Sequence, residues 1–241
     1  MENKYKLDII AETDNWIAVN KPSGLLSIPD RTQSEISLKD ILNEQFGKVW
    51  VVHRLDQPTS GLILFAKNEA AHRYLSQQFE ERKVVKYYAG LVHGTPVPDN
   101  GTIDASTMEH PVKKGTYVTN TKGKPALTDY STLQTFRQYS WMKFQIHTGR
   151  THQIRVHMKH IGHPIVCDDL YGINTPLLLS TIKGSKFKLS KNEEEERPLL
   201  NRLALHAHIL SFTDQDGKVQ TLEAPVPKDL RATLQQLEKW R

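Results

Sequence analysis

The sequence predicts an α+β fold built on a mixed, largely antiparallel sheet. Runs typical of strands outnumber runs typical of helices along the 241 residues. Most neighbouring runs are joined by turns too short for the crossovers that parallel pairing needs. Apolar residues make up 38% of the chain, which suffices for one sizeable core. We therefore expect a single domain over residues 1–241, with room for two lobes.

The first part of the chain alternates strands with two helices. Residues 7–20 predict two short strands around a turn. A helix is expected over 37–46, where Ser37 can cap the first turn and Asp40 takes the capping-box position. A second helix is expected over 68–82, because apolar residues recur there every four residues.

Strands and loops dominate the middle of the chain. A β-rich run over 83–92 leads into residues 93–126, where glycine and proline predict loops. Residues 141–147 alternate apolar and polar side chains, as in a half-buried antiparallel strand. A helix then follows a turn, with Thr151 as its expected N-cap and Gly162 as its stop.

The C-terminal part of the chain begins with a segment that has no clear pattern of strands or helices, and such a pattern then resumes. Residues 173–200 are rich in Lys and Ser and include the acidic run Glu193–Glu196, so we expect an exposed insertion. A strand over 202–207, a hairpin over 208–222 and a last helix over 228–240 follow.

Charge is unevenly distributed. The chain carries a net charge of +5, whereas residues 111–160 hold one acid, Asp129, and nine basic side chains, so that this segment alone carries +8. The nine are Lys113, Lys114, Lys122, Lys124, Arg137, Lys143, Arg150, Arg155 and Lys159. Such a segment suits a polyanion such as a nucleic acid, and a solvated basic face is an equal alternative.

The composition also indicates the cellular compartment of the protein. No run approaches the roughly 20 apolar residues that span a bilayer, and the first residues lack an apolar signal core. The single Cys167 excludes an internal disulfide framework and fits a reducing compartment. We expect a cytoplasmic protein that has no membrane partner and is a monomer.

A charged tetrad lies between two apolar runs, residues 49–52 and 62–66, and both runs predict buried strands. His53-Arg54-Leu55-Asp56 follows one run and precedes a Pro-Thr-Ser-Gly loop and a second run. Arg54 and Asp56 thus stand where a core strand enters a loop, a common place for working side chains. On spacing alone, a surface ion pair with a turn-capping aspartate is the simpler interpretation.

A second motif leads through a turn into the helix expected after Thr151. Its sequence is His147-Thr-Gly-Arg-Thr-His-Gln-Ile-Arg-Val-His157. Its spacing places His152, Arg155 and Lys159 on one face, which could meet a buried carboxylate or a phosphate. Five histidines lie between His147 and His163, so a metal site must be considered. Because His152 and His157 are five residues apart rather than four, and no second cysteine is present, we expect no metal.

Together these strings resemble the RluA-type pseudouridine synthases. The motifs are H-R-L-D-x-x-T-S-G, the early V-N-K-P-S-G-L-L, and T-G-R-x-H-Q-I-R-x-H. The resemblance covers residues 9–227 except 173–200, and no S4-like domain is expected. It implies the pseudouridine synthase fold with a central cleft, isomerisation of uridines in ribosomal or transfer RNA, and no cofactor.

The resemblance also implies roles for four residues. Asp56 is the catalytic nucleophile or base, and Arg155 pairs with it. Arg54 occupies the space that the target base vacates, and Tyr88 packs against that base. On composition alone Tyr88 is a core aromatic. The family usually has alanine two residues after this tyrosine, whereas Gly90 stands there and Ala89 is adjacent, so Tyr87 remains a weaker candidate for the role.

Two other functions remain open from the sequence. A non-catalytic RNA-binding or ribosome-assembly protein would need only the basic segment and stacking aromatics. A metal-dependent hydrolase would use the histidine cluster. The intact Asp56, Tyr88 and Arg155 favour the synthase over the first, and a metal assay on the purified protein distinguishes the second.

Overall fold

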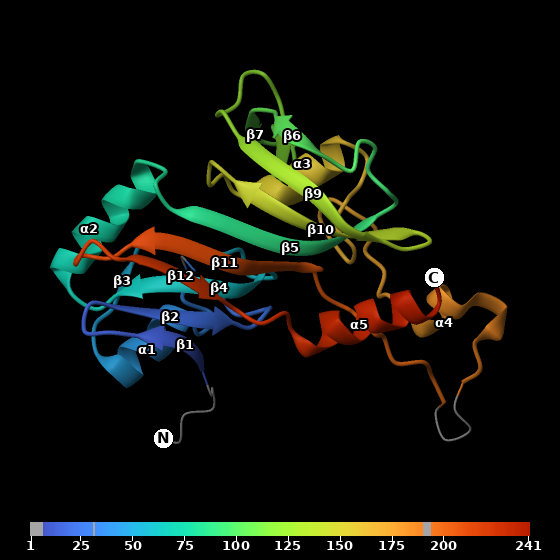
Figure 1. The fold of residues 1–241 in the computed structure, drawn as a ribbon, viewed down its shortest axis with the longest axis horizontal. Helices are drawn as coiled ribbons and strands as arrows, with labels where there is room; N and C mark the ends of the chain where they lie inside the picture. The colour runs from blue at the N-terminus through green and yellow to red at the C-terminus, as the bar shows by residue number, and fades with distance from the viewer. Residues whose placement is uncertain (1–6, 31, 190–193) are drawn as a thin grey trace. The chain divides into compact units, whose positions relative to one another are not determined.

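The computed structural model divides into two compact units. It describes residues 7–30, 32–189 and 194–241 (Figure 1). Unit 1 comprises Met1–Tyr88 and His206–Pro225, and unit 2 comprises Ala89–Leu205 and Val226–Arg241. Both combine a sheet with helices, which confirms the α+β prediction. That residues 1–241 act as one catalytic domain stays a prediction.

The sheet of unit 1 has the strand order β1-β2-β4-β11, with β3 paired to β4 and β12 to β11. The strands are β1 (Asp8–Glu12), β2 (Trp16–Lys21), β3 (Trp50–Val51), β4 (Ser60–Ala66), β11 (Leu205–Thr213) and β12 (Val219–Glu223). Neighbours pair antiparallel except β4 and β11, which are parallel where His206 faces Ser60 and Ala207 faces Gly61. The expected strand over 49–52 is thus reduced to two residues.

Strand β4 is buried along its whole length because a helix covers each of its faces. Its side chains alternate between two apolar clusters. Leu62 and Leu64 join the cluster that contains Leu75 of α2 (Glu69–Glu80). Ile63 and Phe65 join the cluster of α1 (Leu38–Phe46). A continuous apolar run, here residues 62–66, is what two covered faces require.

Both helices of unit 1 begin where the sequence predicts, and each start has a side-chain cap. The Ser37 hydroxyl accepts a hydrogen bond from the Asp40 N–H, and the Asp40 carboxylate accepts one from the Ser37 N–H at 3.0 Å. This is the expected capping box. The Asn68 side chain accepts from the Ala71 N–H at 2.9 Å and starts α2. These local signals therefore fix both starting points.

Strand β5 (Val85–His93) leads along the chain from unit 1 into unit 2, whose sheet has the order β5-β10-β9-β6. The other elements of unit 2 are β6 (Asn100–Asp104), β7 (Thr107–Glu109), β8 (Tyr117–Thr119), β9 (Leu127–Thr135), β10 (Tyr139–Ile146), α3 (Gln153–His160), α4 (Leu179–Lys183), the 3-10 turn Gly184–Lys186 and α5 (Lys228–Lys239). Residues 93–126, expected as loops, thus hold three strands. The alternation of β10 is confirmed, since Met142, Phe144 and Ile146 are buried.

Helix α3 begins one residue later than the sequence predicts. Its N-cap is His152, in a left-handed conformation and without a side-chain capping bond, so the expected Thr151 cap is wrong. Gln153 explains the shift. Its side-chain oxygen accepts from the Arg150 N–H at 3.0 Å and from the Thr148 hydroxyl at 2.7 Å, which closes the preceding turn from inside the helix. The expected cationic face is also split, because Arg155 is buried and Lys159 is exposed.

The predicted insertion, 173–200, is attached to unit 2 at both ends. Leu177 and Leu200 are buried and pair through a backbone hydrogen bond of 2.7 Å. Between them, α4 has no buried residue, and residues 190–193 lie outside the described part of the chain. The core of unit 2 therefore reaches into this segment at its ends.

No helix in the described residues is long and apolar enough to cross a membrane.

Leu200→Ala is expected to lower the free energy of unfolding by about 2–5 kcal/mol, because it empties a buried position. Leu189→Ala, at a side chain that is 40% exposed within the same segment, is the matched control and is expected to change it by less than about 0.5 kcal/mol. Urea unfolding of both variants measures the difference. Equal, small losses would show that the whole segment lies outside the core.

Candidate active site

Asp56 lies in a tight turn between β3 and β4. The turn is closed by a hydrogen bond of 3.0 Å from the Thr59 N–H to the Asp56 carbonyl. Leu55 is buried, and the Ser27 hydroxyl both donates to its carbonyl at 2.7 Å and accepts from its N–H at 3.1 Å. With Leu55 directed inward, Arg54 is exposed and Asp56 is half-buried. The backbone at Asp56 is thus held by its neighbours, while the side chain keeps access to solvent.

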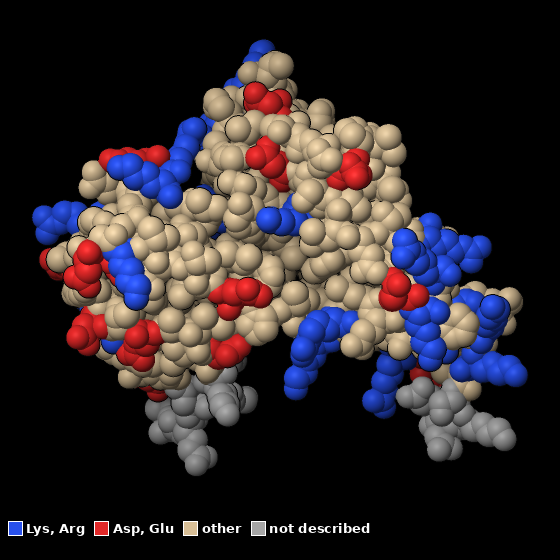
Figure 2. Space-filling view, in the orientation of Figure 1, with Lys and Arg blue, Asp and Glu red and all other residues tan. Residues whose placement is uncertain are grey.

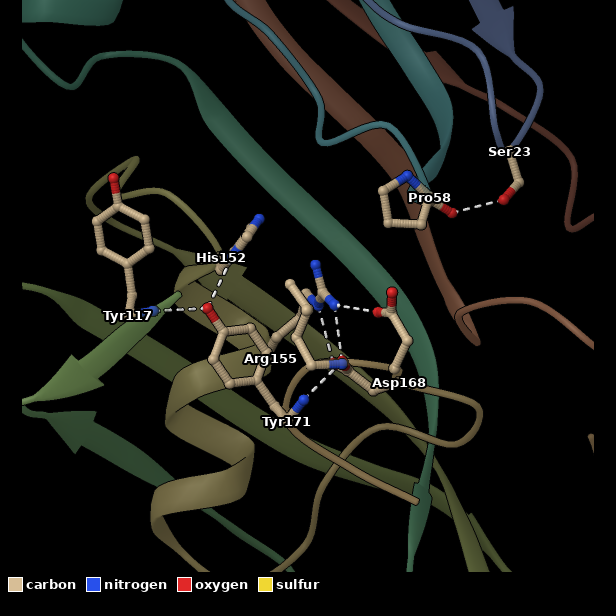
Figure 3. A network of polar contacts seen from close by, with 9 residues as sticks. Ser23, Pro58, Tyr117, His152, Arg155, Asp168 and Tyr171 are labelled. Atoms are coloured by element: carbon tan, nitrogen blue, oxygen red, sulfur yellow. Dashed lines mark hydrogen bonds and ion pairs between the residues drawn. The ribbon is translucent and has the colours of Figure 1, made fainter. Parts of the chain in front are cut away.

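The ammonium group of Lys21 stabilises this turn through hydrogen bonds to backbone carbonyl groups. Lys21 is fully buried, and its Nζ donates to the carbonyl oxygens of Pro22, Leu25 and Gln57 at 2.8–3.0 Å. The Ser23 hydroxyl adds a hydrogen bond of 2.6 Å to the Pro58 carbonyl (Figure 3). The early Lys-Pro-Ser-Gly motif therefore supports the residues next to Asp56. Sequence reasoning assigned it no role, although the motif itself was the available signal.

The downstream side of the turn is fixed by Gly61. Its φ is +116°, and a Cβ there would lie 2.1 Å from the carbonyl oxygen of Ala207 on β11. Only glycine permits this approach of two backbones. Beside it, the buried Ser60 hydroxyl lies 3.0 Å from His206 Nδ1. Ser60 and Gly61 therefore hold the start of β4 against β11.

His53 is a structural member of the charged tetrad. Its Nε2 accepts a hydrogen bond of 3.0 Å from the Leu64 N–H, and its ring stacks on Phe79 at 4.6 Å between centroids. Burial, followed by the nearby Lys86 charge, lowers the pKa of His53 from 6.5 to about 3. The neutral ring is what accepting from a backbone N–H requires. His53 thus stays uncharged and joins β4 to α2.

Tyr88 lies close enough to Asp56 for the carboxylate charge to act on its hydroxyl. Burial raises the pKa of the Tyr88 hydroxyl above its ordinary value, and the Asp56 carboxylate adds to the rise. Tyr88 also packs on the apolar cluster that contains Leu55. Its hydroxyl therefore stays protonated, and its ring borders the turn of Asp56.

Gly90 follows Tyr88 on the same face of β5, where the family usually has alanine. A Cβ at Gly90 would lie 3.0 Å from the Ala204 carbonyl oxygen and 3.1 Å from the Phe144 ring. These contacts are tighter than side chains normally make. The departure from the family pattern thus has a local steric reason.

Arg155 is the centre of a buried ionic network in unit 2 (Figure 3). Its guanidinium makes a two-point contact with Asp168 at 2.8 and 2.7 Å and a third bond of 3.0 Å to Asp169. Its charge lies 5.0 Å from the centre of the Tyr171 ring. Sequence reasoning missed all three partners, though they lie in a segment, 163–172, that it compared with the family. The expected pairing of Arg155 with Asp56 stays a prediction.

Two residues beside this network have strained backbones. His152 and Cys167 both have φ of +56°, which is unusual for residues with a side chain. The Tyr171 hydroxyl holds His152 by a hydrogen bond of 2.7 Å to Nδ1 and accepts another of 2.8 Å from the Tyr117 N–H. Strain of this kind persists where the surroundings overdetermine the conformation, often at functional sites.

The histidines of this region each have a separate protein partner. His147 contacts Asp129 at 2.6 Å, and the buried His157 bonds Thr128 and the Ala105 carbonyl. His160 contacts Thr119, and His163 contacts the His93 carbonyl. Within the described residues, no group of three or more His, Cys, Asp or Glu side chains is arranged to hold a metal.

Two segments of unit 2 carry exposed basic side chains. Six of the nine in residues 111–160 are exposed: Lys113, Lys114, Lys122, Lys124, Arg137 and Lys159. On the face drawn in Figure 2, a second group covers the region of α4 and the end of α5. There the Lys183 and Lys186 ammonium groups lie 5.0 and 5.8 Å from the Trp240 ring centre. The charge count of the sequence did not reveal this second group.

Comparison with known proteins identifies the family to which this chain belongs. The family model described as RNA pseudouridylate synthase matches residues 15–160, more than half of the chain. A protein of Aquifex aeolicus named uncharacterized RNA pseudouridine synthase is 40% identical over 180 residues, 70% of this chain and 57% of that protein. Ribosomal large subunit pseudouridine synthase D of Buchnera aphidicola is 32% identical over 240 residues, 95% of this chain and 72% of that protein.

A solved structure agrees with these sequences. Human RNA pseudouridylate synthase domain containing 1 matches with a TM-score of 0.72 and 27% identity, over 92% of this chain and 84% of that one. The chain therefore belongs to the RNA pseudouridine synthase family, a class of isomerases that modify RNA, and has the fold of that family.

Lys21→Met is expected to lower the free energy of unfolding by roughly 3 kcal/mol or more, because three buried carbonyl groups lose their donor. Lys67→Met is the matched control. Lys67 pairs with the exposed Glu12, so its loss is expected to cost about 1 kcal/mol or less. Urea unfolding measures both. A loss for Lys21→Met no larger than the control's would show that the carbonyl contacts contribute little.

His53→Gln is expected to reduce the sensitivity of stability to acid. The folded pKa of His53 is about 3 and the ordinary value is 6.5, so within this window only the unfolded chain binds the proton. His53 therefore contributes stability above pH 6.5 that is lost as the pH falls toward 3, with a slope of up to about 1.4 kcal/mol per pH unit. The glutamine side chain retains an acceptor for the Leu64 N–H and does not titrate. Urea unfolding at pH 6.5 and 4.5 compares the slopes, and identical slopes would contradict the prediction.

Proposed function

We propose that this protein converts uridine within structured RNA into pseudouridine, with Asp56 as the nucleophile or base. In this isomerisation the C1′–N1 bond breaks, the uracil rotates and a C1′–C5 bond forms. C5 loses a proton and N1 gains one, so that no atom is gained overall. The observation that carries the proposal is the half-buried Asp56 carboxylate on a supported turn, in a chain of this family.

The surrounding residues suit the steps that the reaction needs. A base must leave its stack to reach Asp56, and we assign Tyr88 to stack against it, in keeping with its place beside the Asp56 turn. The exposed Arg54 is assigned to the space that the base leaves in the RNA. Arg155 is assigned to keep Asp56 ionised, since a neighbouring guanidinium favours a carboxylate.

The substrate we propose is a stem-loop of ribosomal or transfer RNA. Ribosomal RNA is the first candidate, because the Buchnera relative is named for the large ribosomal subunit. The isomerisation consumes no co-reactant, so the proposal includes no cofactor and no metal. We place the reaction in the cytoplasm, on a monomer of this chain.

A non-catalytic RNA-binding protein is the second candidate. The exposed basic side chains of residues 111–160 favour it, because they would attract RNA without any chemistry. The two candidates differ in the need for the Asp56 carboxylate.

Asp56→Asn is expected to reduce pseudouridine formation by about a thousand-fold or more, because asparagine cannot act as an anionic nucleophile or base. RNA affinity is expected to change little, since phosphate contacts supply most of it. Single-turnover formation of pseudouridine in total ribosomal and transfer RNA, beside a binding titration, measures both.

Asp14→Asn, at an exposed turn of the same unit, is the control and is expected to keep wild-type turnover. Full activity in EDTA is expected as well and would oppose a metal-dependent hydrolase. Wild-type turnover by Asp56→Asn would overturn the assignment, and binding without any pseudouridine in the wild type would favour the second candidate.

A further inference from the structure

Unit 2 contains a pocket of about 320 Å³ formed by the β7–β8 hairpin, α3 and the loop that follows α3. Its polar lining includes His110, Lys113, Thr119, Lys159, His160 and Tyr171. The buried Val156 and Tyr171 contribute to its wall, while Lys113, Lys159 and His160 are exposed. The volume lies at the small end of the range for ligand pockets.

The lining of this pocket has one sign of charge. It contains two lysines and two histidines and no Asp or Glu. Glu109, the acid of the hairpin, has its carboxylate occupied by the Gly115 N–H at 2.9 Å and is not part of the lining. Cationic walls around a concave surface attract an anion more strongly than the same charges on an open face.

Neutral donors are arranged there as well. His110 Nδ1 accepts the N–H groups of Val112 and Lys113, each at 3.1 Å, so the ring proton of neutral His110 is on Nε2. His160 Nδ1 and the Thr119 hydroxyl lie 3.0 Å apart and hold each other in place. The pocket therefore offers the Nε2–H of His110 beside the ammonium groups, and from the Thr119–His160 pair one further donor, either the hydroxyl or the Nε2–H, depending on the tautomer of His160.

Tyr171 joins the pocket to the network of Arg155. The Arg155 charge lies 5.0 Å and the Lys159 Nζ 5.8 Å from the centre of its ring. The Tyr171 hydroxyl is fixed by Tyr117, a second residue of the pocket wall, and by His152 (Figure 3). A ligand that holds Lys159 thus acts on the same ring that packs against Arg155.

We propose that this pocket binds a backbone phosphate of the RNA substrate. The inference rests on the proposed function, since it takes RNA as the ligand. Ammonium groups bind phosphate as point charges, and ring N–H and hydroxyl groups complete its hydrogen bonds. A phosphate here contributes to affinity and register and carries no base specificity.

The test compares two double variants with the same change in charge. Lys113→Gln/Lys159→Gln removes the ammonium groups of the pocket. Lys122→Gln/Lys124→Gln removes two exposed ammonium groups of the same basic segment that do not line it. Both are titrated with a ribosomal RNA stem-loop between 50 and 200 mM salt, and their melting temperatures verify folding.

We expect the pocket variant to weaken RNA binding at least tenfold and the control less than about threefold. The slope of log affinity against log salt is expected to become shallower by about 0.7–0.9 for each phosphate that the pocket variant no longer neutralises. Equal reductions in affinity for the two variants would overturn the proposal, as would undetectable RNA binding by the wild type.

Titration with inorganic phosphate and with uridine monophosphate separates RNA from a free ligand. We expect both to bind more weakly than 1 mM. Micromolar binding of either that disappears only in the pocket variant would replace RNA with a small phosphate ligand and overturn the proposal. Pseudouridine formation is measured separately, so wild-type RNA binding without product refutes the proposed function and leaves the pocket supported.

Discussion

The buried ammonium group of Lys21 organises the loop that carries Asp56. A charge removed from water is costly unless its donors are satisfied. Lys21 directs its donors at carbonyl oxygens of Pro22, Leu25 and Gln57, which lie on two separate stretches of chain. The early Lys-Pro-Ser-Gly motif and the Asp56 turn consequently form one structural piece, and neither can shift without exposing the charge or leaving carbonyl groups unpaired.

Unit 2 also contains a buried charge, that of Arg155, but different groups stabilise it. Arg155 is as deeply buried as Lys21, but its partners are carboxylates and an aromatic ring rather than backbone dipoles. Asp168 also accepts the N–H groups of Leu170 and Tyr171, each at 3.0 Å, so the carboxylate orders its own loop while it holds the guanidinium. A side chain fixed on so many sides has one orientation, which suits a group that must meet its target in a defined geometry.

Local signals in the sequence were sufficient for two local features. The capping box at Ser37 and the alternation along β10 depend on neighbours within a few residues, and both were predicted correctly. The start of α3 is also local but was predicted wrongly, because the Gln153 side chain closes the preceding turn in place of a Thr151 cap. Lys21, Asp168 and Tyr171 act through partners that only the tertiary fold or a loop brings near. The roles of Asp56, Arg54, Tyr88 and Arg155 came from the family resemblance, since spacing alone favoured an ordinary turn.

The strained residue next to Asp168 has a practical consequence. Cys167 is the only cysteine of the 241 residues, and its thiol is buried against the carbonyls of Thr175 and Leu200. Burial raises the pKa of this thiol, which further suppresses its reactivity. A thiol reagent can therefore modify the native protein only when the segment around Asp168 opens. The rate of that labelling reports, without any engineered probe, how often the carboxylate that holds Arg155 leaves its place.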